Sequence, residues 1–213
     1  PHKDLVISPT APLLECNRKR CPTCRDKCRY YCRQCLVPRG PATPPTLPPL
    51  PWTYDVFKHN QERKGKSTAL HVKVLCPNES NVWTYPQDVE RYTAQADPEK
   101  TLVLYPSARA QPISAIDPSS FTHIVVLDGT WYQAHQMARD TPLLQDSRVR
   151  HVSFASPPQT KFWRHQQKGG DHLATIEAMW WLVREFMVAH RPSEDYHRYD
   201  DLLWYFTFTY QRI

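Results

Sequence analysis

A carboxylate, a hydroxyl and a large aromatic side chain stand together in Asp128-Gly129-Thr130-Trp131, a combination that could bind and activate a small molecule. The preceding run, residues 123–127, is short, apolar and rich in β-branched residues, which is typical of a buried strand. In open α/β sheets, ligands bind beyond the carboxyl ends of the strands, where Asp128 would lie. The same residues also fit an ordinary helix start, with Asp128 or Thr130 as the N-cap and Trp131 in the core.

Four cysteines are spaced as metal ligands. Two Cys-x-x-Cys pairs, at 21–24 and 32–35, are separated by seven residues, and four thiolates at this spacing can close a tetrahedral shell around zinc. Such a shell has no open position, so the ion would be structural. An extracellular disulfide knot is disfavoured because the chain is not small and Cys76 is the only later cysteine. The predicted ligands are Cys21, Cys24, Cys32 and Cys35, with Cys16 and Cys28 as spare candidates.

The excess positive charge of the chain is concentrated around these cysteines. The net charge is +6, and residues 16–35 hold seven Lys or Arg against one Asp, which leaves 20 basic and 20 acidic residues elsewhere. This cluster favours a polyanionic partner, with Arg25 and Arg29 as contacts, although a solvated loop would show the same charge. Tyr30 and Tyr31 could stack on unpaired bases or pack inside the small module.

Composition divides the chain into three parts. Residues 1–37 comprise a lead-in and the four-cysteine module, 38–51 form a strap with seven prolines in fourteen residues, and 52–213 form the main domain. Prolines at this density favour an extended polyproline-like conformation, which either holds the module at a set distance or lies on the surface of the body. The sequence contains no run of about 18 apolar residues, so no transmembrane helix is predicted. It also shows no apolar N-terminal segment of the signal-peptide type.

Short apolar strands alternate with helical patterns in the main domain. The segment 69–75 alternates with period two, which predicts a strand with one solvated face. The alternation of strands and helices predicts an α/β fold with a mainly parallel sheet. The further predicted strands are 101–105, 123–127 and 149–154, and the predicted helices are 130–139 and 175–189.

Two further basic stretches indicate contacts with RNA. Lys58, His59 and Lys66 precede the predicted strand at 69–75 and are expected to contact phosphates; the Gly-x-x-x-x-Gly-Lys pattern is missing, which excludes nucleoside triphosphate binding. In 161–170, aromatic residues alternate with basic ones, which suits base stacking and backbone neutralisation but also a lid loop with a buried Trp. The expected RNA contacts of this stretch are Lys161, Trp163, Arg164 and Lys168.

The last long helix begins with a sequence that could grip an anion. Thr175 and the free N–H groups of a helix N-terminus attract a carboxylate or a phosphate. Glu177 could instead be an ordinary first-turn acid that complements the helix dipole. Residues 173–178 therefore offer either a ligand contact or plain helix capping.

Taken together, these residues resemble the DTW-domain family of RNA aminocarboxypropyltransferases. Asp128-x-Thr130-Trp131 is similar to the family signature, and Tyr105-Pro106-Ser107 resembles its strand-end turn. Residues 162–164 followed by 173–178 resemble the closing block of the family, although Ala174 stands where the family usually has Ser. The resemblance runs from about Cys21 to Ala189.

The type 1, eukaryotic branch of the family resembles this chain most. The features shared with that branch are the paired Cys-x-x-Cys knuckles, Val37-Pro38, Lys58-His59 and the segment 65–69. The resemblance implies a SPOUT-like α/β fold with a knotted C-terminal part. It also implies S-adenosylmethionine as cofactor, bound without a Gly-x-Gly-x-x-Gly loop, which this chain lacks.

The implied reaction is transfer of the 3-amino-3-carboxypropyl group to N3 of a D-loop uridine in tRNA, with release of methylthioadenosine. A nuclear location is implied, with a cytoplasmic or organellar location as the alternative. A monomer is slightly favoured, and no membrane partner is expected.

This reaction suggests roles for the residues singled out above. Uridine N3 is a poor nucleophile until it loses its proton, so Asp128 is predicted to act as general base. Trp131 could contact the sulfonium through a cation–π interaction or form a wall of the adenine pocket. The residues expected to bind the cofactor are Tyr105, Pro106, Leu127, Thr130, Trp131, Thr175 and Glu177.

Other functions stay open at this stage. The same fold could carry a SPOUT-type RNA methyltransferase or an aminocarboxypropyltransferase that acts on ribosomal RNA. A zinc-dependent RNA-binding module with an inactive catalytic fold is the alternative from outside the enzymes.

Overall fold

The structure is a computed structural model that describes residues 4–62, 65–156, 160 and 173–212. Its centre is a six-stranded sheet in the order β6-β5-β9-β7-β10-β8, and every neighbouring pair is parallel. The predicted α/β class with a parallel sheet is therefore confirmed, and the strands expected around 101–105, 123–127 and 149–154 are present. The strands are β5 (Thr53–His59), β6 (Ser80–Tyr85), β7 (Thr101–Leu104), β8 (Gln111–Pro112), β9 (His123–Asp128) and β10 (Arg150–Ser153).

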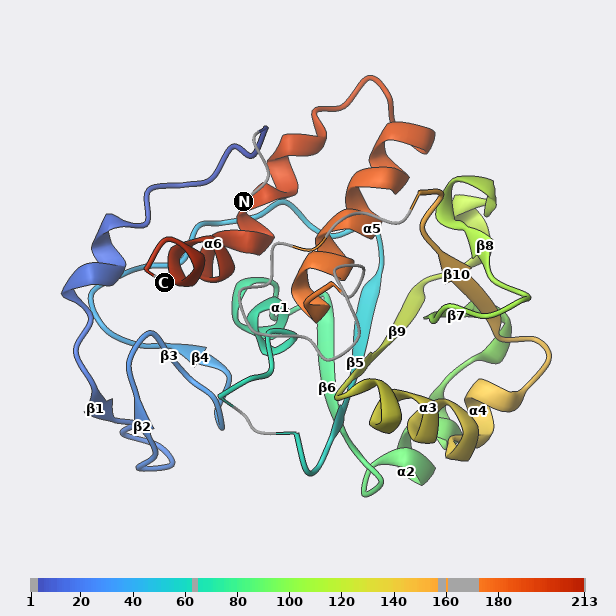
Figure 1. Cartoon of the computed structure of the whole chain (residues 1–213), viewed down its shortest axis with the longest axis horizontal. Helices are drawn as coiled ribbons and strands as arrows, with labels where there is room; N and C mark the ends of the chain where they lie inside the picture. Colours follow the sequence, from blue (N-terminus) through green and yellow to red (C-terminus); the bar gives the residue numbers. More distant parts are fainter. Residues whose placement is uncertain (1–3, 63–64, 157–159, 161–172, 213) are drawn as a thin grey trace.

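Helices cover both faces of this sheet (Figure 1). Within the described residues, no helix is long and apolar enough to cross a membrane. The α-helices are α1 (Leu70–Leu75), α2 (Val89–Gln95), α3 (Trp131–Asp140), α4 (Pro142–Gln145), α5 (Thr175–His190) and α6 (Trp204–Tyr210). The 3₁₀ helices are η1 (Ala11–Glu15), η2 (Pro98–Lys100), η3 (Ile113–Ala115), η4 (Pro118–Ser120) and η5 (Tyr196–Leu203).

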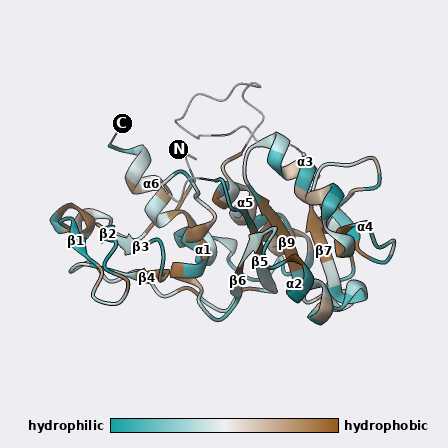
Figure 2. Cartoon of the chain, turned by 90° about the horizontal axis from the view of Figure 1, so that it is seen from below, coloured by the Kyte–Doolittle hydropathy of each residue, from teal (hydrophilic) through white to brown (hydrophobic). Residues whose placement is uncertain are grey.

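Alternate residues of the central strand β9 enter two separate cores. Ile124 and Val126 pack in the core that α1, α5 and α6 cover, whereas Val125 packs in the core under α2, α3 and α4. Successive side chains of a strand point to opposite faces, so a continuous apolar run is what a strand covered on both faces requires. The central strands β9 and β7 accordingly stand out as hydrophobic in Figure 2.

The N-terminal module consists of two small antiparallel hairpins at one end of the molecule (Figure 1). Strand β1 (Lys19–Arg20) pairs with β2 (Lys27–Cys28), and β3 (Tyr31–Cys32) pairs with β4 (Val37–Pro38). The module packs on the body through Tyr31, whose ring contacts His71 of α1 and Tyr205 of α6.

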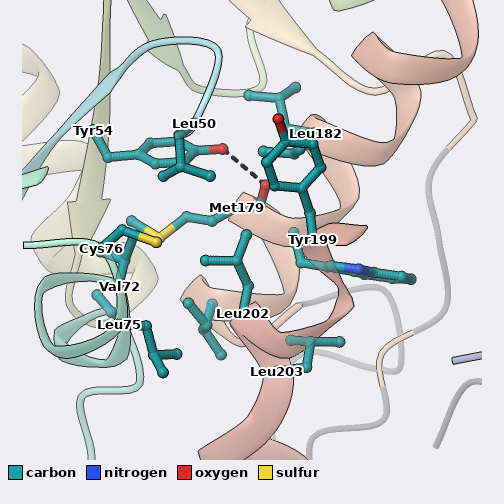
Figure 3. Close-up of a cluster of buried hydrophobic side chains, with 14 of the residues drawn as sticks. Leu50, Tyr54, Val72, Leu75, Cys76, Met179, Leu182, Tyr199, Leu202 and Leu203 are labelled. Carbon is teal, nitrogen blue, oxygen red and sulfur yellow. Dashed lines mark hydrogen bonds between the residues drawn. The ribbon is translucent and has the colours of Figure 1, made fainter. Parts of the chain in front are cut away.

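The proline-rich strap lies against the body. Ala42 and Leu50 are buried in the large core, and the Tyr199 hydroxyl donates to the Pro49 carbonyl at 3.1 Å. Figure 3 shows Leu50 beside Tyr54, whose hydroxyl donates to the Met179 carbonyl at 2.8 Å. The strap therefore lies on the surface of the body and does not hold the module at a distance from it.

The lead-in is held by the C-terminal segment. The backbone N–H groups of Val6 and Ser8 donate to the carboxylates of Asp200 and Asp201, at 2.9 and 2.7 Å. The part of the chain after α5 thus has a structural role that its sequence pattern did not indicate, because it fixes the lead-in beside η5.

The prediction of a strand at 69–75 is wrong, because this segment forms helix α1. Counting His71 as a polar residue produced the apparent alternation. His71 is instead buried, and its ring packs edge-on against Tyr31 at 5.6 Å. Burial, assisted by the charge of Arg33, lowers the pKa of His71 to about 3, so the side chain is neutral and packs as an aromatic residue.

The buried imidazole predicts a specific pH dependence of stability. His71 is neutral in the folded protein and protonated in the unfolded chain between pH 6.5 and about 3, so unfolding takes up a proton in this range. Stability should therefore fall by about 1.4 kcal/mol per pH unit as the pH drops below 6.5. His71→Phe keeps the aromatic packing and should lose this slope, which urea unfolding at pH 7.5, 6 and 5 would measure. Parallel pH profiles of the variant and the unmodified protein would contradict the assignment.

Candidate cofactor pocket and cysteine cluster

Four cysteines of the N-terminal module converge on one point. The sulfur atoms of Cys21, Cys24, Cys32 and Cys35 all lie within 4.8 Å of one another. The Sγ–Sγ distance is 3.9 Å for Cys21 and Cys35 and 3.4 Å for Cys24 and Cys32. Four sulfurs placed tetrahedrally at about 2.3 Å from a zinc ion would be about 3.8 Å apart. The four sulfur donors and their spacing therefore fit a metal ion with tetrahedral coordination.

Each pair of ligands is built by a tight turn of the same kind. The N–H of Arg25 donates to the Cys21 carbonyl at 2.9 Å, and the N–H of Leu36 donates to the Cys32 carbonyl at 2.8 Å. Arg25 and Leu36 have φ values of 64° and 55°, in the left-handed region that non-glycine residues rarely adopt. The residue after the second cysteine thus turns the chain in both knuckles.

Thiolate formation is favoured at Cys21. The backbone N–H of Cys24 lowers the pKa of Cys21 to about 6, and the Arg39 guanidinium donates to its sulfur at 3.2 Å. The two spare cysteines lie outside the cluster. The Cys16 sulfur lies 3.9 Å from the Pro12 carbonyl oxygen, and the Cys28 thiol donates to the Lys19 carbonyl at 3.7 Å.

A cavity of about 360 Å³ lies at the carboxyl ends of β7, β9 and β10. Its walls are mainly apolar, and this volume lies within the range of small-molecule sites. Helix α5 covers it with Thr175 and Ala178. Of the residues expected to bind a cofactor, the cavity brings together Tyr105, Pro106, Leu127, Trp131 and Thr175. Pattern analysis missed Ser153, the last residue of β10, and Phe154, which follows it; both line the cavity but belong to no distinctive motif.

Asp128 lies behind this cavity and is held by two hydroxyl groups. Its side chain is 3% exposed; Thr175 Oγ1 donates to Oδ1 at 2.9 Å, and Ser67 Oγ donates to Oδ2 at 2.6 Å. Burial raises the pKa of Asp128, while these two hydrogen bonds and the charge of Lys58 act in the opposite direction. Because Thr175 also lines the cavity, its hydroxyl connects the carboxylate with the pocket.

The residues after Asp128 perform both of the roles considered from the sequence. Thr130 is the N-cap of α3: Thr130 Oγ1 accepts from the Gln133 N–H at 3.3 Å, and Gln133 Oε1 accepts from the Thr130 N–H at 2.8 Å. Trp131 is instead a wall of the cavity and is 38% exposed. A Cβ atom at Gly129 would lie 2.9 Å from Gln133 Oε1, so a larger residue there would displace the side chain that completes the cap of α3.

The start of α5 is capped from inside the helix and from the segment before α1. Glu177 is buried, and its carboxylate accepts the Ala174 N–H at 2.9 Å, so it acts in helix capping and is not among the residues that line the cavity. The Ile176 N–H donates to Thr68 Oγ1 at 3.4 Å. Ala174 is the N-cap residue but carries no side-chain acceptor.

The residues expected to contact RNA lie in different environments. Lys58 and His59 are buried, and Lys58 Nζ donates to the carbonyls of His59 and Glu62 at 3.1 and 2.7 Å, which holds the turn after β5. Arg25 and Lys66 are exposed, whereas Arg29 is half-buried and donates through Nε to the Cys16 carbonyl at 2.7 Å. Lys161, Trp163, Arg164 and Lys168 lie outside the described residues.

The two tyrosines of the module pack against the body. Tyr30 is half-buried and meets Phe208 of α6 edge-on, with ring centroids 5.2 Å apart, and Tyr31 is buried against α1 and α6. Both rings thus pack between the module and the body, an arrangement that differs from packing inside the module.

The DTW domain family matches residues 29–213, and the chain belongs to this family. The tRNA-uridine aminocarboxypropyltransferase 1 of Xenopus laevis is 29% identical to it, over 92% of this chain and 80% of its own length. The proteins of the same name from Mus musculus and Homo sapiens are 28% and 26% identical, each over 92% of this chain and 77% of their own length. The resemblance seen in the motifs is thus confirmed. No solved structure matches the chain.

The missing N-cap side chain of α5 predicts that Ala174→Ser stabilises the protein. Ala174 has the extended backbone of an N-cap residue, with φ −63° and ψ 147°, so a serine hydroxyl there could accept an N–H of the first turn. We expect a gain of about 1 kcal/mol in the free energy of unfolding, measured by urea denaturation. Ala174→Val is the matched control and should bring no gain. If the serine variant is no more stable than the valine variant, the backbone N–H groups at the start of α5 already have hydrogen-bond acceptors.

Proposed function

We propose that this protein is a tRNA-uridine aminocarboxypropyltransferase that uses S-adenosylmethionine. The observation that carries this proposal is membership of the DTW family over residues 29–213, with Asp128, Thr175 and Trp131 gathered at one cavity. The likeness to vertebrate enzymes of that name over 92% of this chain supports it further.

The cavity fits the nucleoside part of S-adenosylmethionine. Leu104, Leu127 and Phe154 offer apolar walls, and the Trp131 ring can face either the adenine or the positively charged sulfur. When bound, the cofactor supplies a sulfonium whose propyl carbon is electrophilic. Orientation then selects the reactive carbon, because the propyl arm must face the nucleotide while the methyl group is turned away.

Asp128 receives the proton of uridine N3 in this proposal. Thr175 lines the cavity and its hydroxyl donates to Asp128, so in this proposal the hydroxyl passes the proton to the carboxylate. The new N3–C bond forms as the C–S bond breaks, and its electron pair stays on sulfur in neutral methylthioadenosine. A carboxylate pKa raised by burial suits a base that must take up this proton.

The choice of a D-loop uridine in tRNA and the N3 position follow the family and are part of the proposal. The exposed Arg25 and Lys66 would contribute to attracting the RNA backbone. We further propose a SPOUT-like arrangement with a knotted C-terminal part. The parallel order in which β7 lies between β9 and β10 supports it. Nuclear location and a monomeric state stay predictions.

We also propose that the four-cysteine cluster holds a structural zinc ion. Four thiolates complete a tetrahedral shell and leave no position for substrate. The ion would fix the position of Tyr31, which immediately precedes the ligand Cys32 and packs on α1 and α6.

The activity is tested by incubating the protein with S-adenosylmethionine and unmodified tRNA, followed by digestion to nucleosides and mass spectrometry. Asp128→Asn should lower transfer by about 10² to 10⁴-fold, because it removes the general base, while binding of the cofactor is retained. Asp117→Asn, which alters a carboxylate that caps η4, is the control and should keep full activity. Full activity of the Asp128 variant would contradict its role as base. A methyl adduct would favour a methyltransferase, and tRNA binding with no adduct a non-catalytic module.

The zinc proposal predicts one bound ion per chain, measured by elemental analysis of the purified protein. Cys32→Ser should remove it, because a hydroxyl is a poor replacement for a thiolate ligand. Cys28→Ser is the matched control, since Cys28 belongs to the same module but lies outside the cluster, and it should keep the ion. Metal-free protein, or equal metal loss in both variants, would overturn the assignment of ligands.

A further inference from the structure

A second cavity, of about 210 Å³, shares the Tyr105 side chain with the cofactor pocket. Its walls come from β7, α3, α4 and β10 and include His135, Arg139, Leu144 and His151. No carboxylate is among the residues that line it. Arg139 of this wall is paired with Asp140, whereas Arg109, which is not a lining residue, contacts the lining residues His151 and Leu144.

The tautomer of His151 follows from its two partners. Arg109 can only donate, and its Nη2 lies 2.5 Å from His151 Nε2, so that nitrogen is the acceptor. The proton of the neutral ring is then on Nδ1, which donates to Ser107 Oγ at 2.9 Å. Burial and the neighbouring Arg109 charge both lower the pKa of His151, in agreement with a neutral ring. Ser107 and Arg109 thus hold the two nitrogens of the His151 ring.

Arg109 is oriented without being neutralised. Its Nη2 also donates to the Leu144 carbonyl at 3.3 Å, so His151 and Leu144 fix the plane of the guanidinium. Among the described residues, no carboxylate pairs with Arg109, whereas the nearby Arg139 and Arg148 pair with Asp140 and Asp146. The remaining N–H groups of Arg109 can thus serve a ligand, and the residue is exposed.

We propose that Arg109, oriented by His151 and Leu144, binds an oxyanion beside the second cavity. The remaining edge of the guanidinium matches the oxygens of a phosphate or a carboxylate. This inference rests on the proposed function for the source of the oxyanion. The source is either an RNA phosphate next to the target uridine or the carboxylate of S-adenosylmethionine, because Tyr105 lines both the second cavity and the cofactor pocket.

The site itself is tested with inorganic phosphate, independently of the proposed function. The imidazole nitrogen resonances of His151 are followed by NMR as phosphate is added at constant ionic strength. We expect a saturable shift in the unmodified protein, its loss in Arg109→Gln and a weaker affinity in Ser107→Ala. Arg148→Gln removes the same charge at an arginine that is paired with Asp146, and it should keep the response. No saturable shift, or an equal shift in Arg109→Gln, would overturn the proposal.

The source of the oxyanion is separated by comparing three ligands with Arg109→Gln. If it is the cofactor carboxylate, the affinity for S-adenosylmethionine falls about 10-fold or more, while that for methylthioadenosine, which lacks the carboxylate, is unchanged. If it is an RNA phosphate, tRNA binding weakens in the variant. The slope of the logarithm of the binding constant against the logarithm of the salt concentration then becomes shallower by about one. Both affinities unchanged would overturn the site. Failure of the unmodified protein to bind either ligand would instead contradict the proposed function, and the phosphate titration would still decide the site.

Discussion

The region around the cavity depends on one buried carboxylate. Asp128 is 3% exposed, and burial of a carboxylate is costly unless hydrogen-bond donors replace the lost water. Ser67 and Thr175 supply two such donors, from positions 61 and 47 residues away in the chain. The carboxylate therefore fixes the end of β9, the segment before α1 and the start of α5 relative to one another. Loss of any of the three would leave a buried polar group without its partner.

The two hydrogen bonds to Asp128 also determine where the cavity forms. Thr68 adds a second link, because its hydroxyl accepts the Ile176 N–H at the first turn of α5. Helix α5 consequently begins at the carboxyl edge of the sheet, where Tyr105 follows β7 and Phe154 follows β10. The cavity is the space that remains between these strand ends and the helix. A residue that looks catalytic in the sequence is thus also the residue that assembles the site.

Features with local determinants could be predicted from the sequence, and features with distant determinants could not. The two Cys-x-x-Cys knuckles were predictable because each turn is closed by a backbone hydrogen bond within the knuckle. The apolar run of β9 was equally direct. The prediction for segment 69–75 failed because His71 is buried against Tyr31 and Tyr205, which come from opposite ends of the chain, and burial keeps its imidazole neutral. The bond from Ser67 to Asp128 has no signal in the sequence for the same reason.

Charge shows this limit most clearly, since a sequence gives the sign of a side chain but not its partners. The Lys58 ammonium stands in a basic stretch, yet it donates to two backbone carbonyls. Arg109 belongs to no basic stretch, yet its guanidinium is oriented and has no carboxylate partner among the described residues. Net charge attracts a polyanion from a distance, whereas oriented donors fix one anionic group in place. The basic residues of the N-terminal module suit the first task, and a site such as that of Arg109 suits the second.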